Sequence, residues 1–263
     1  MKKLLSLFAV SALALVACKS TGSVSGTVID PFTGKAVELP TVYVKGTTFS
    51  SQKIPGGLPD GTFKFEGIEE GTYTVEAGKG KYSKGHTEFT ISKDAANAKA
   101  DIYIYSQSTD PGLYRPVEGA NAEKISARAI FQPICKETGI AFRTKFTVEN
   151  PQTKKKDENV LPAPVDVPPD VTLLIKIATS VSSPIEATSY PILTESAKKH
   201  ADCDGVDPKE TLIVPNLSKG TVIPSAYKSE NLYEIKGSLQ SGKQILAIKQ
   251  DGKLVNAYYI NAK

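Results

Sequence analysis

Short runs of alternating or β-branched residues, separated by glycine and proline, restrict the fold of this chain more than any other feature. In one run, Phe63 and Phe65 fall on one side and Lys64 on the other, which is the pattern of a half-buried strand. In segment 30–34, Pro31 fixes φ and Gly34 accepts a positive φ, so the chain is expected to reverse there. The N-terminal runs are 24–29, 37–44, 61–65, 71–77, 86–91 and 100–105. The pattern predicts antiparallel β structure.

The remainder of the chain continues with runs of the same kind. These are 125–131, 140–148, 171–179, 211–214, 233–239, 244–248 and 254–260, and only 195–200 favours a short helix. The polar, turn-rich residues 106–112 lie between the two sets and indicate a boundary. We therefore predict an all-β chain with a first domain at 24–106, a linker at 107–116 and a second β-rich domain of unassigned family at 117–263.

The motifs of the first domain resemble those of carboxypeptidase regulatory-like domains, which have a transthyretin-like fold. The matching segments are GTVID at 26–30, TG at 33–34, VYVKGT at 42–47, DGTFKF at 60–65 and GIEEGTYTV at 67–75. The resemblance covers residues 24–105 and implies an antiparallel β-sandwich that is normally non-catalytic and serves as a spacer, folding aid or binding module. It brings no peptidase chemistry with it, because neither His86 nor His200 is followed at the third position by the glutamate of a zinc carboxypeptidase motif.

The first eighteen residues have the pattern of a secretory signal. Lys2 and Lys3 precede an apolar run at 4–16, and Ala17 stands just before Cys18. The run is shorter than the ~20 residues with which a helix crosses a bilayer. We predict a signal peptide at 1–17 and a short lipidated tether at 18–23, which would keep the folded body close to the membrane.

Segment LVAC at 15–18 resembles the lipobox of bacterial lipoproteins. The resemblance implies that Cys18 is S-diacylated, with palmitate for example, becomes the first residue after cleavage and anchors the protein through its acyl chains. Lys19 follows, and a residue other than Asp here resembles the outer-membrane sorting signal of many Gram-negative bacteria. A plain secretion signal with an incidental cysteine is the alternative, and the periplasmic and external faces of the envelope both stay open.

The other two cysteines, Cys135 and Cys203, are an even number in a chain that is expected to enter an oxidising compartment. We predict a disulfide between them, which in the chain-entropy account would stabilise the fold by about 4 kcal/mol. The alternatives are two separate buried thiols, or a thiol used in metal or redox chemistry.

An acidic segment surrounds Cys203, with Asp202, Asp204 and Asp207 close to Gly205. Oxygen ligands at alternating positions beside a glycine turn suit calcium. The full EF-hand spacing is absent, and an acidic surface turn held by a disulfide accounts for the same residues. We therefore predict no metal and no cofactor, with a calcium turn as the alternative.

Two further segments are candidate surface features. Residues 151–170 contain three consecutive lysines and several prolines, which predict an exposed loop. Tyr103 and Tyr105 alternate with Ile102 and Ile104 on one strand, so one pair should enter the core and the other face outward or towards the second domain. We expect the tyrosines to cover the junction between the domains; a sugar-stacking surface is the alternative.

The charge and the missing motifs restrict the function. The net charge is +4 and lysines are interspersed with acids, so no nucleic-acid partner is predicted. The chain has no Gly-x-Ser-x-Gly elbow and no phosphate loop. The sequence favours a non-catalytic lipoprotein of the cell envelope that binds a protein or glycan partner. A surface adhesin for host ligands and a hydrolase using a residue such as His200 are the alternatives.

Overall fold

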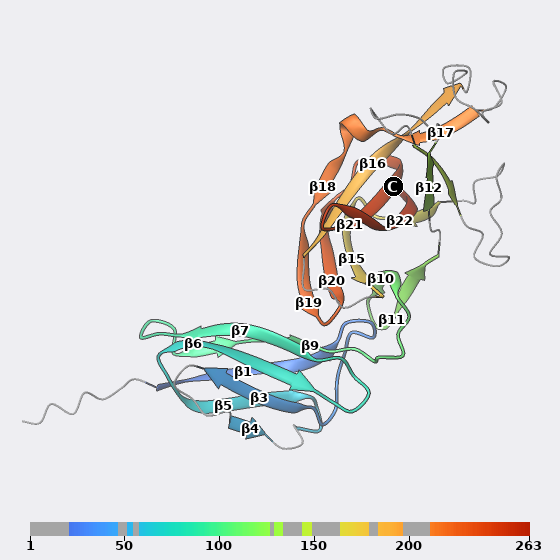
Figure 1. Ribbon diagram of the computed structural model, residues 1–263. Coiled ribbons are helices and arrows are strands. Elements are labelled where there is room, and N and C mark those ends of the chain that lie inside the picture. The colour runs from blue at the N-terminus through green and yellow to red at the C-terminus, as the bar shows by residue number, and fades with distance from the viewer. Residues whose placement is uncertain are drawn as a thin grey trace, which may run out of the picture.

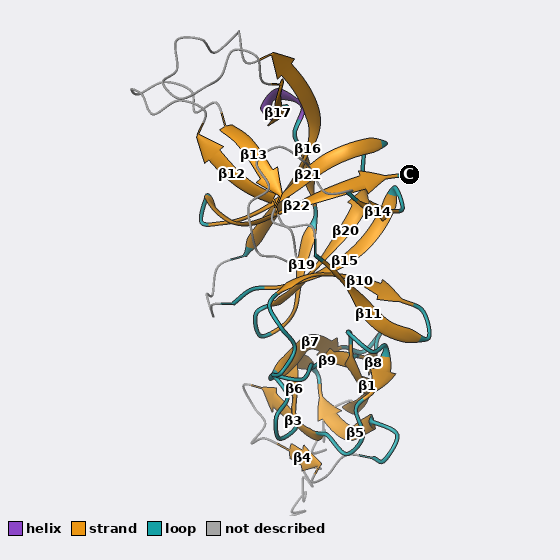
Figure 2. Cartoon of the chain, turned by 90° about the vertical axis from the view of Figure 1, so that its right-hand side faces the viewer, coloured by secondary structure: helices purple, strands orange, loops and turns teal. Residues whose placement is uncertain are grey.

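The computed structural model describes residues 21–46, 52–54, 58–126, 129–133, 144–148, 164–178, 184–196 and 211–263. Within these ranges the chain is all-β, as predicted, and the one helical turn is the 3-10 helix η2 (Leu217–Lys219). The same ranges hold no helix with the length and apolar character that crossing a membrane requires. The strands form two layered bodies, which we call the N-terminal sandwich (21–103) and the C-terminal sandwich (112–262) (Figure 1, Figure 2).

The N-terminal sandwich consists of two sheets. In the first, β1 (Thr21–Asp30) pairs antiparallel with β2 (Lys35–Ala36) and β5 (Thr62–Glu69), and parallel with β8 (Asn97–Lys99) and β9 (Ile102–Tyr103). The second has the order β4 (Gln52–Ile54), β3 (Thr41–Gly46), β6 (Gly71–Gly78), β7 (Gly85–Ile91). Both sheets contribute to one core, whose members include Val24, Val28, Val42, Val75, Ile102 and Ile104.

The structure confirms two local predictions for the N-terminal part of the chain, the half-buried strand at 63–65 and the turn at 30–34. Phe63 and Phe65 of β5 are buried in the core, and Lys64 between them is exposed. The reversal after β1 is closed by a hydrogen bond from the Gly34 amide to the Asp30 carbonyl (2.8 Å), with Gly34 at a φ of 66°. The Asp30 carboxylate accepts a further bond from the Phe32 amide (2.9 Å), which fixes the direction of the turn.

The C-terminal sandwich is also made of two main sheets. One has the order β11 (Ala120–Ile125), β10 (Gly112–Val117), β15 (Asp170–Lys176), β20 (Leu232–Ser238), β19 (Ser225–Ser229). The other has the order β14 (Val165–Val167), β22 (Lys253–Ala262), β21 (Gly242–Gln250), β16 (Ile185–Ser196), β17 (Thr211–Pro215), with β18 (Thr221–Ile223) also paired to β16. A separate pair is formed by β12 (Ala129–Pro133) and β13 (Thr144–Val148).

The core of the C-terminal sandwich lies between its two main sheets. Its members include Leu173, Ile175 and Ile235 from the first sheet and Leu246, Ile248 and Ile260 from the second. Because strands alternate their faces, β15 directs Leu173 and Ile175 into this core and Leu174 to the opposite side of the sheet. Leu174 is nevertheless buried, which requires something outside the C-terminal sandwich to cover it.

Three segments differ from the sequence-based expectation. Strand β14 lies inside the predicted loop 151–170 and pairs parallel with β22, because Val165 and Val167 pack on the core. The helix expected at 195–200 is wrong for Glu195 and Ser196, which continue β16 through pairing with β17. Residues from Gly112 onward in the predicted linker form β10. The assignment of two separately folding domains stays a prediction.

Candidate functional site

The two sandwiches meet through the turn that follows β1. Phe32 at its tip is buried against Tyr105, Tyr114, Leu174 and Leu232, so the N-terminal sandwich covers the outer face of β15 and β20. The Phe32 ring makes edge contacts with Tyr105 (centroids 5.6 Å apart) and Tyr114 (4.8 Å). Such edge-to-face contacts are the favoured geometry for aromatic pairs. The junction is therefore a small apolar core in its own right.

Hydrogen bonds across the junction supplement this apolar contact. The Ala122 amide of β11 donates to the Phe32 carbonyl (2.6 Å), and the Tyr105 hydroxyl donates to the Glu230 carbonyl (2.5 Å). Ser229 donates through its hydroxyl to the Lys84 carbonyl (3.0 Å) and lies 2.9 Å from the Ser83 hydroxyl. Because the Ser229 hydroxyl has one proton, which goes to Lys84, Ser83 is the donor to Ser229.

Beside this junction, β19 of the C-terminal sandwich lies against β7 and β9 of the N-terminal sandwich (Figure 1). The side chains here line a cleft of about 580 Å³. Its floor is the outer face of the β3–β6–β7 sheet, where Tyr43, Glu76 and His86 form a row because they are register partners on neighbouring strands. The C-terminal sandwich closes the row with Tyr227 of β19 and Glu230. The residues that line the cleft are Tyr43, Lys45, Glu76, Ala77, Gly78, Lys84, Gly85, His86, Tyr227 and Glu230.

An aromatic pair spans the two sandwiches in this cleft. The centroid of the His86 ring lies 5.1 Å from that of Tyr227, and the Tyr227 and Tyr233 rings make an edge-to-face contact with centroids 5.9 Å apart. Tyr227 is 46% exposed, so the contact with Tyr233 fixes the ring while part of its surface stays open to a ligand. Burial raises the pKa of Tyr227, with smaller contributions from Tyr233 and Glu230. Its phenol is therefore protonated at neutral pH and able to donate a hydrogen bond.

The charges of the cleft are balanced. Lys45 and Glu76 form an ion pair at 2.5 Å, and Lys84 and Glu230 provide one further charge of each sign. The exposed ion pair is screened by water and adds little to stability. Its ammonium and carboxylate instead give the cleft both donors and acceptors of hydrogen bonds.

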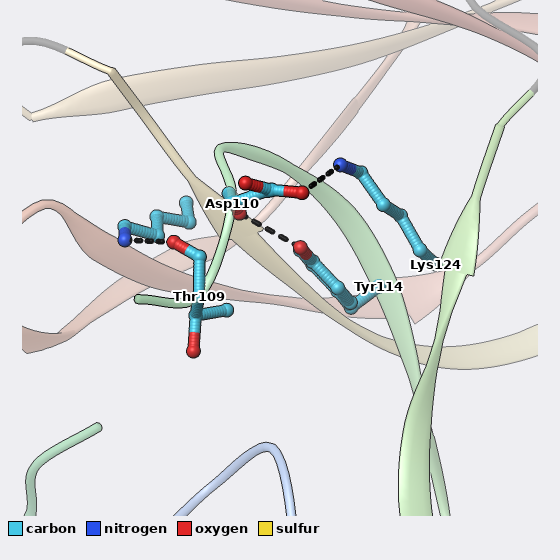
Figure 3. A network of polar contacts seen from close by, with 5 residues as sticks. Thr109, Asp110, Tyr114 and Lys124 are labelled. Carbon is cyan, nitrogen blue, oxygen red and sulfur yellow. Dashed lines mark hydrogen bonds and ion pairs between the residues drawn. The ribbon is translucent and has the colours of Figure 1, made fainter. Parts of the chain in front are cut away.

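A second, smaller pocket of about 390 Å³ lies on the connection between the sandwiches and shares Glu230 with the cleft. In Figure 3, Tyr114 of β10 and Lys124 of β11 converge on Asp110: the Tyr114 hydroxyl donates to its carbonyl (2.7 Å) and the Lys124 ammonium lies 3.5 Å from its carboxylate. Lys176 donates to the Thr109 carbonyl, and its ammonium lies 4.9 Å from the centre of the Tyr105 ring. These contacts hold residues 109 and 110 against β10 and β15.

Burial of the Lys176 side chain lowers the pKa of its ammonium, because an apolar environment disfavours the charged form. The ammonium still contacts the Thr109 carbonyl and the Tyr105 ring, and both groups stabilise a cation. We interpret Lys176 as a structural connection between β15 and the segment that joins the sandwiches.

The residues predicted from sequence as sites are Cys18, Cys135, Cys203, Asp202, Asp204 and Asp207, and they lie outside the residues that the structure describes, as does His200. Across the described ranges, no group of three or more His, Cys, Asp or Glu side chains is placed to hold a metal ion.

The predictions for Tyr103 and Tyr105 are confirmed. Tyr105 is buried in the junction, and the Lys228 ammonium lies 4.7 Å from the centre of the Tyr103 ring.

The sequence interpretation did not find the row formed by Tyr43, Glu76, His86 and Tyr227. Three of these residues alternate outward on predicted strands, which places them on one face of one sheet. Tyr227 lies about 140 residues further along the chain, in a strand that was not predicted, and no local pattern connects it to His86.

No family model matches this chain, and no curated protein matches it. Among solved structures it is similar to a candidate carbohydrate-binding protein from Bacteroides uniformis, at 10% identity over 91% of this chain and 96% of that one, with a TM-score of 0.27. A DUF3823 family protein from Bacteroides ovatus matches at 14% identity over 93% and 97%, with a TM-score of 0.26. The major pilin subunit of Bacillus cereus matches at 10% identity over 92% and 69%, with a TM-score of 0.28.

Proposed function

We propose that this protein is a lipid-anchored, non-catalytic binding module of a bacterial cell envelope, and that the cleft between its sandwiches holds a protein or glycan partner. The observation that carries the proposal is the contact between His86 and Tyr227, one from each sandwich, at the side of an open cleft. Phe32 and the hydrogen bonds of the junction fix the two sides of that cleft relative to each other. A preformed site binds without the cost of ordering its own walls.

The proposed anchor is the lipid on Cys18, and the proposed destination is the outer membrane. Strand β1 begins at Thr21, so two residues separate the cysteine from the folded body. Such a short connection would keep the N-terminal sandwich against the bilayer surface. The chain with Cys18→Ser should lose incorporation of labelled palmitate and move from the detergent phase to the aqueous phase in detergent partition. Unchanged labelling of this variant would reject the anchor.

Site-specific photocrosslinking in cells tests the cleft. A photoreactive amino acid at Lys84, inside the cleft, should capture a partner that the same amino acid at Val222 does not capture. Val222 is the matched control because it is exposed and belongs to β18, away from the cleft. Identical adducts from both positions would count against the cleft as the binding surface.

Protease treatment of intact and permeabilised cells distinguishes the two faces of the envelope. Digestion in intact cells would place the body outside and favour a surface adhesin. Protection until permeabilisation would reject the adhesin and direct the search to periplasmic partners.

A further inference from the structure

We propose that the ligand of the cleft is a neutral glycan, an inference that rests on the binding function proposed above. The first observation is the partly open ring surface of Tyr227. A sugar ring has faces of C–H groups that pack on an aromatic ring and an edge of hydroxyls that need hydrogen-bond partners. A tyrosine offers both, since its ring is apolar and its hydroxyl is polar.

The second observation is the density of polar groups around that ring. Glu76 and Glu230 supply carboxylate acceptors, Lys45 and Lys84 supply ammonium donors, and all of them line the same cleft. Hydroxyls both donate and accept hydrogen bonds, so a ligand rich in hydroxyls can satisfy all four side chains. A cleft of about 580 Å³ falls within the roughly 300–1,000 Å³ of small-molecule sites.

The balance of charge favours a neutral ligand. The two lysines and two glutamates of the cleft cancel, and one of each is already joined in the Lys45–Glu76 ion pair. A polyanion would gain from Lys84 but would place its charge beside Glu230 and Glu76. A polycation would meet the opposite conflict, so neither sign of net charge is favoured.

The distribution of exposed apolar side chains favours a glycan over a protein. The central part of a protein interface is apolar and rich in large side chains. Of the large exposed hydrophobic residues among the described parts of the chain, Tyr227 alone lines the cleft. The others lie outside the lining of the cleft: Leu39, Leu58, Val117, Leu193, Leu217, Val222 and Leu254.

The ring of Tyr227 is also held in place before a ligand arrives. The Tyr233 ring lies nearly perpendicular to it, with the centroids 5.9 Å apart, and the centroid of the His86 ring lies 5.1 Å away. Immobilising a side chain on binding costs conformational entropy, and a ring that its neighbours already hold loses less of it. A glycan, whose binding contacts are individually weak, depends on such prior ordering.

The test uses the chain from Lys19 onward on an array of neutral and acidic glycans, followed by calorimetry with the neutral oligosaccharide that binds best. We expect binding to at least one neutral glycan. Tyr227→Ala should weaken that binding by about tenfold or more, the loss common for a buried aromatic anchor. Tyr227→Phe keeps the ring and should stay within about threefold, and Val222→Ala, outside the cleft, should leave binding unchanged.

Three results would overturn the inference: binding to acidic glycans alone, no binding to any neutral glycan on the array, or neutral binding that survives Tyr227→Ala. The proposed function is tested separately by crosslinking from position 84. If a protein is crosslinked at position 84 and no neutral glycan on the array binds, the proposed binding function stands and the glycan inference is rejected. Absence of both signals would reject both proposals.

Discussion

The hydroxyls of Ser83 and Ser229 lie 2.9 Å apart although the two residues are separated by 146 positions in the chain. Both side chains are buried, and each also forms a hydrogen bond with the backbone. Ser83 accepts from the Tyr105 amide (3.0 Å), and Ser229 donates to the Lys84 carbonyl. This short chain of bonds crosses the junction between the sandwiches and reaches the backbone of Lys84, a residue that lines the candidate cleft. The junction thus has the buried, satisfied polar contacts of a protein interior.

Removing the Ser229 hydroxyl should destabilise the junction. In Ser229→Ala, the Lys84 carbonyl and the Ser83 hydroxyl lose a buried partner, which costs about 1–3 kcal/mol of the free energy of unfolding. Urea denaturation measures the change. Ser218→Ala is the matched control, since Ser218 is exposed and bonds only within its own turn, and should change stability by less than about 0.5 kcal/mol. Equal effects of the two variants would contradict the prediction.

Truncating Phe32 should uncouple the two sandwiches. Phe32→Ala removes the ring that fills the junction core, and a buried Phe→Ala change costs about 3–5 kcal/mol. Because Phe32 belongs to neither main core, we expect calorimetry to resolve two unfolding transitions in this variant. The variant Phe32→Leu, which keeps an apolar side chain, should retain one transition. A single transition at lower temperature in Phe32→Ala would show that other contacts suffice for coupling.

Stability should fall in strongly alkaline solution through Tyr105. Burial raises the pKa of Tyr105 to about 12, and Glu230 and Tyr227 add to the effect. The unfolded chain loses the same proton near pH 10, so the stabilisation is complete below about pH 10 and is lost as the pH rises through about 12. Urea titrations across this window, with tyrosinate absorbance as a second signal, test it.

The variant Tyr105→Phe separates this effect from general alkaline unfolding. At neutral pH it should be less stable by about 1 kcal/mol, because the bond to the Glu230 carbonyl is missing. The difference from the original chain should shrink as the pH approaches 12. A pH dependence of stability identical in both chains would exclude Tyr105 as its source.

Gly85 should tolerate no side chain. A Cβ there would lie 2.1 Å from the Tyr103 carbonyl, a backbone atom that cannot move aside without shifting β9. Gly85→Ala should therefore cost about 1–3 kcal/mol or more, measured by thermal unfolding. Gly78 on the neighbouring strand β6 is the matched control, since a Cβ there meets nothing within 4 Å, and Gly78→Ala should be neutral. Destabilisation by Gly78→Ala alone would contradict the packing argument.

Local signals in the sequence predicted most strands of the N-terminal sandwich. The alternation of Phe63, Lys64 and Phe65 and the turn at 30–34 depend on neighbouring residues only, and both are as expected. The burial of Phe32 at the tip of this turn could not be predicted. The residues that cover it follow it in the chain by 73 positions or more. A phenylalanine at a turn looks exposed until its long-range partners are known.

Long-range pairing also explains the errors in the C-terminal sandwich. Strand β16 contains Pro191 and a series of small polar residues, which argue against a strand. Its polar side chains are satisfied within the sheets: Ser189 donates to Gln244, and Thr188 donates to Glu186. The candidate cleft was missed for the same reason, since it forms only where β7 meets β19.

The position of β22 has a consequence for the order of folding. This strand lies between β14 and β21, and the Lys263 amide bonds to the Val167 carbonyl (3.1 Å). Val165 of β14 pairs with Ile260 of β22, a residue 95 positions further along the chain. Because β22 separates its two neighbours in the sheet, β14 can join the sheet only after β22 has docked on β21.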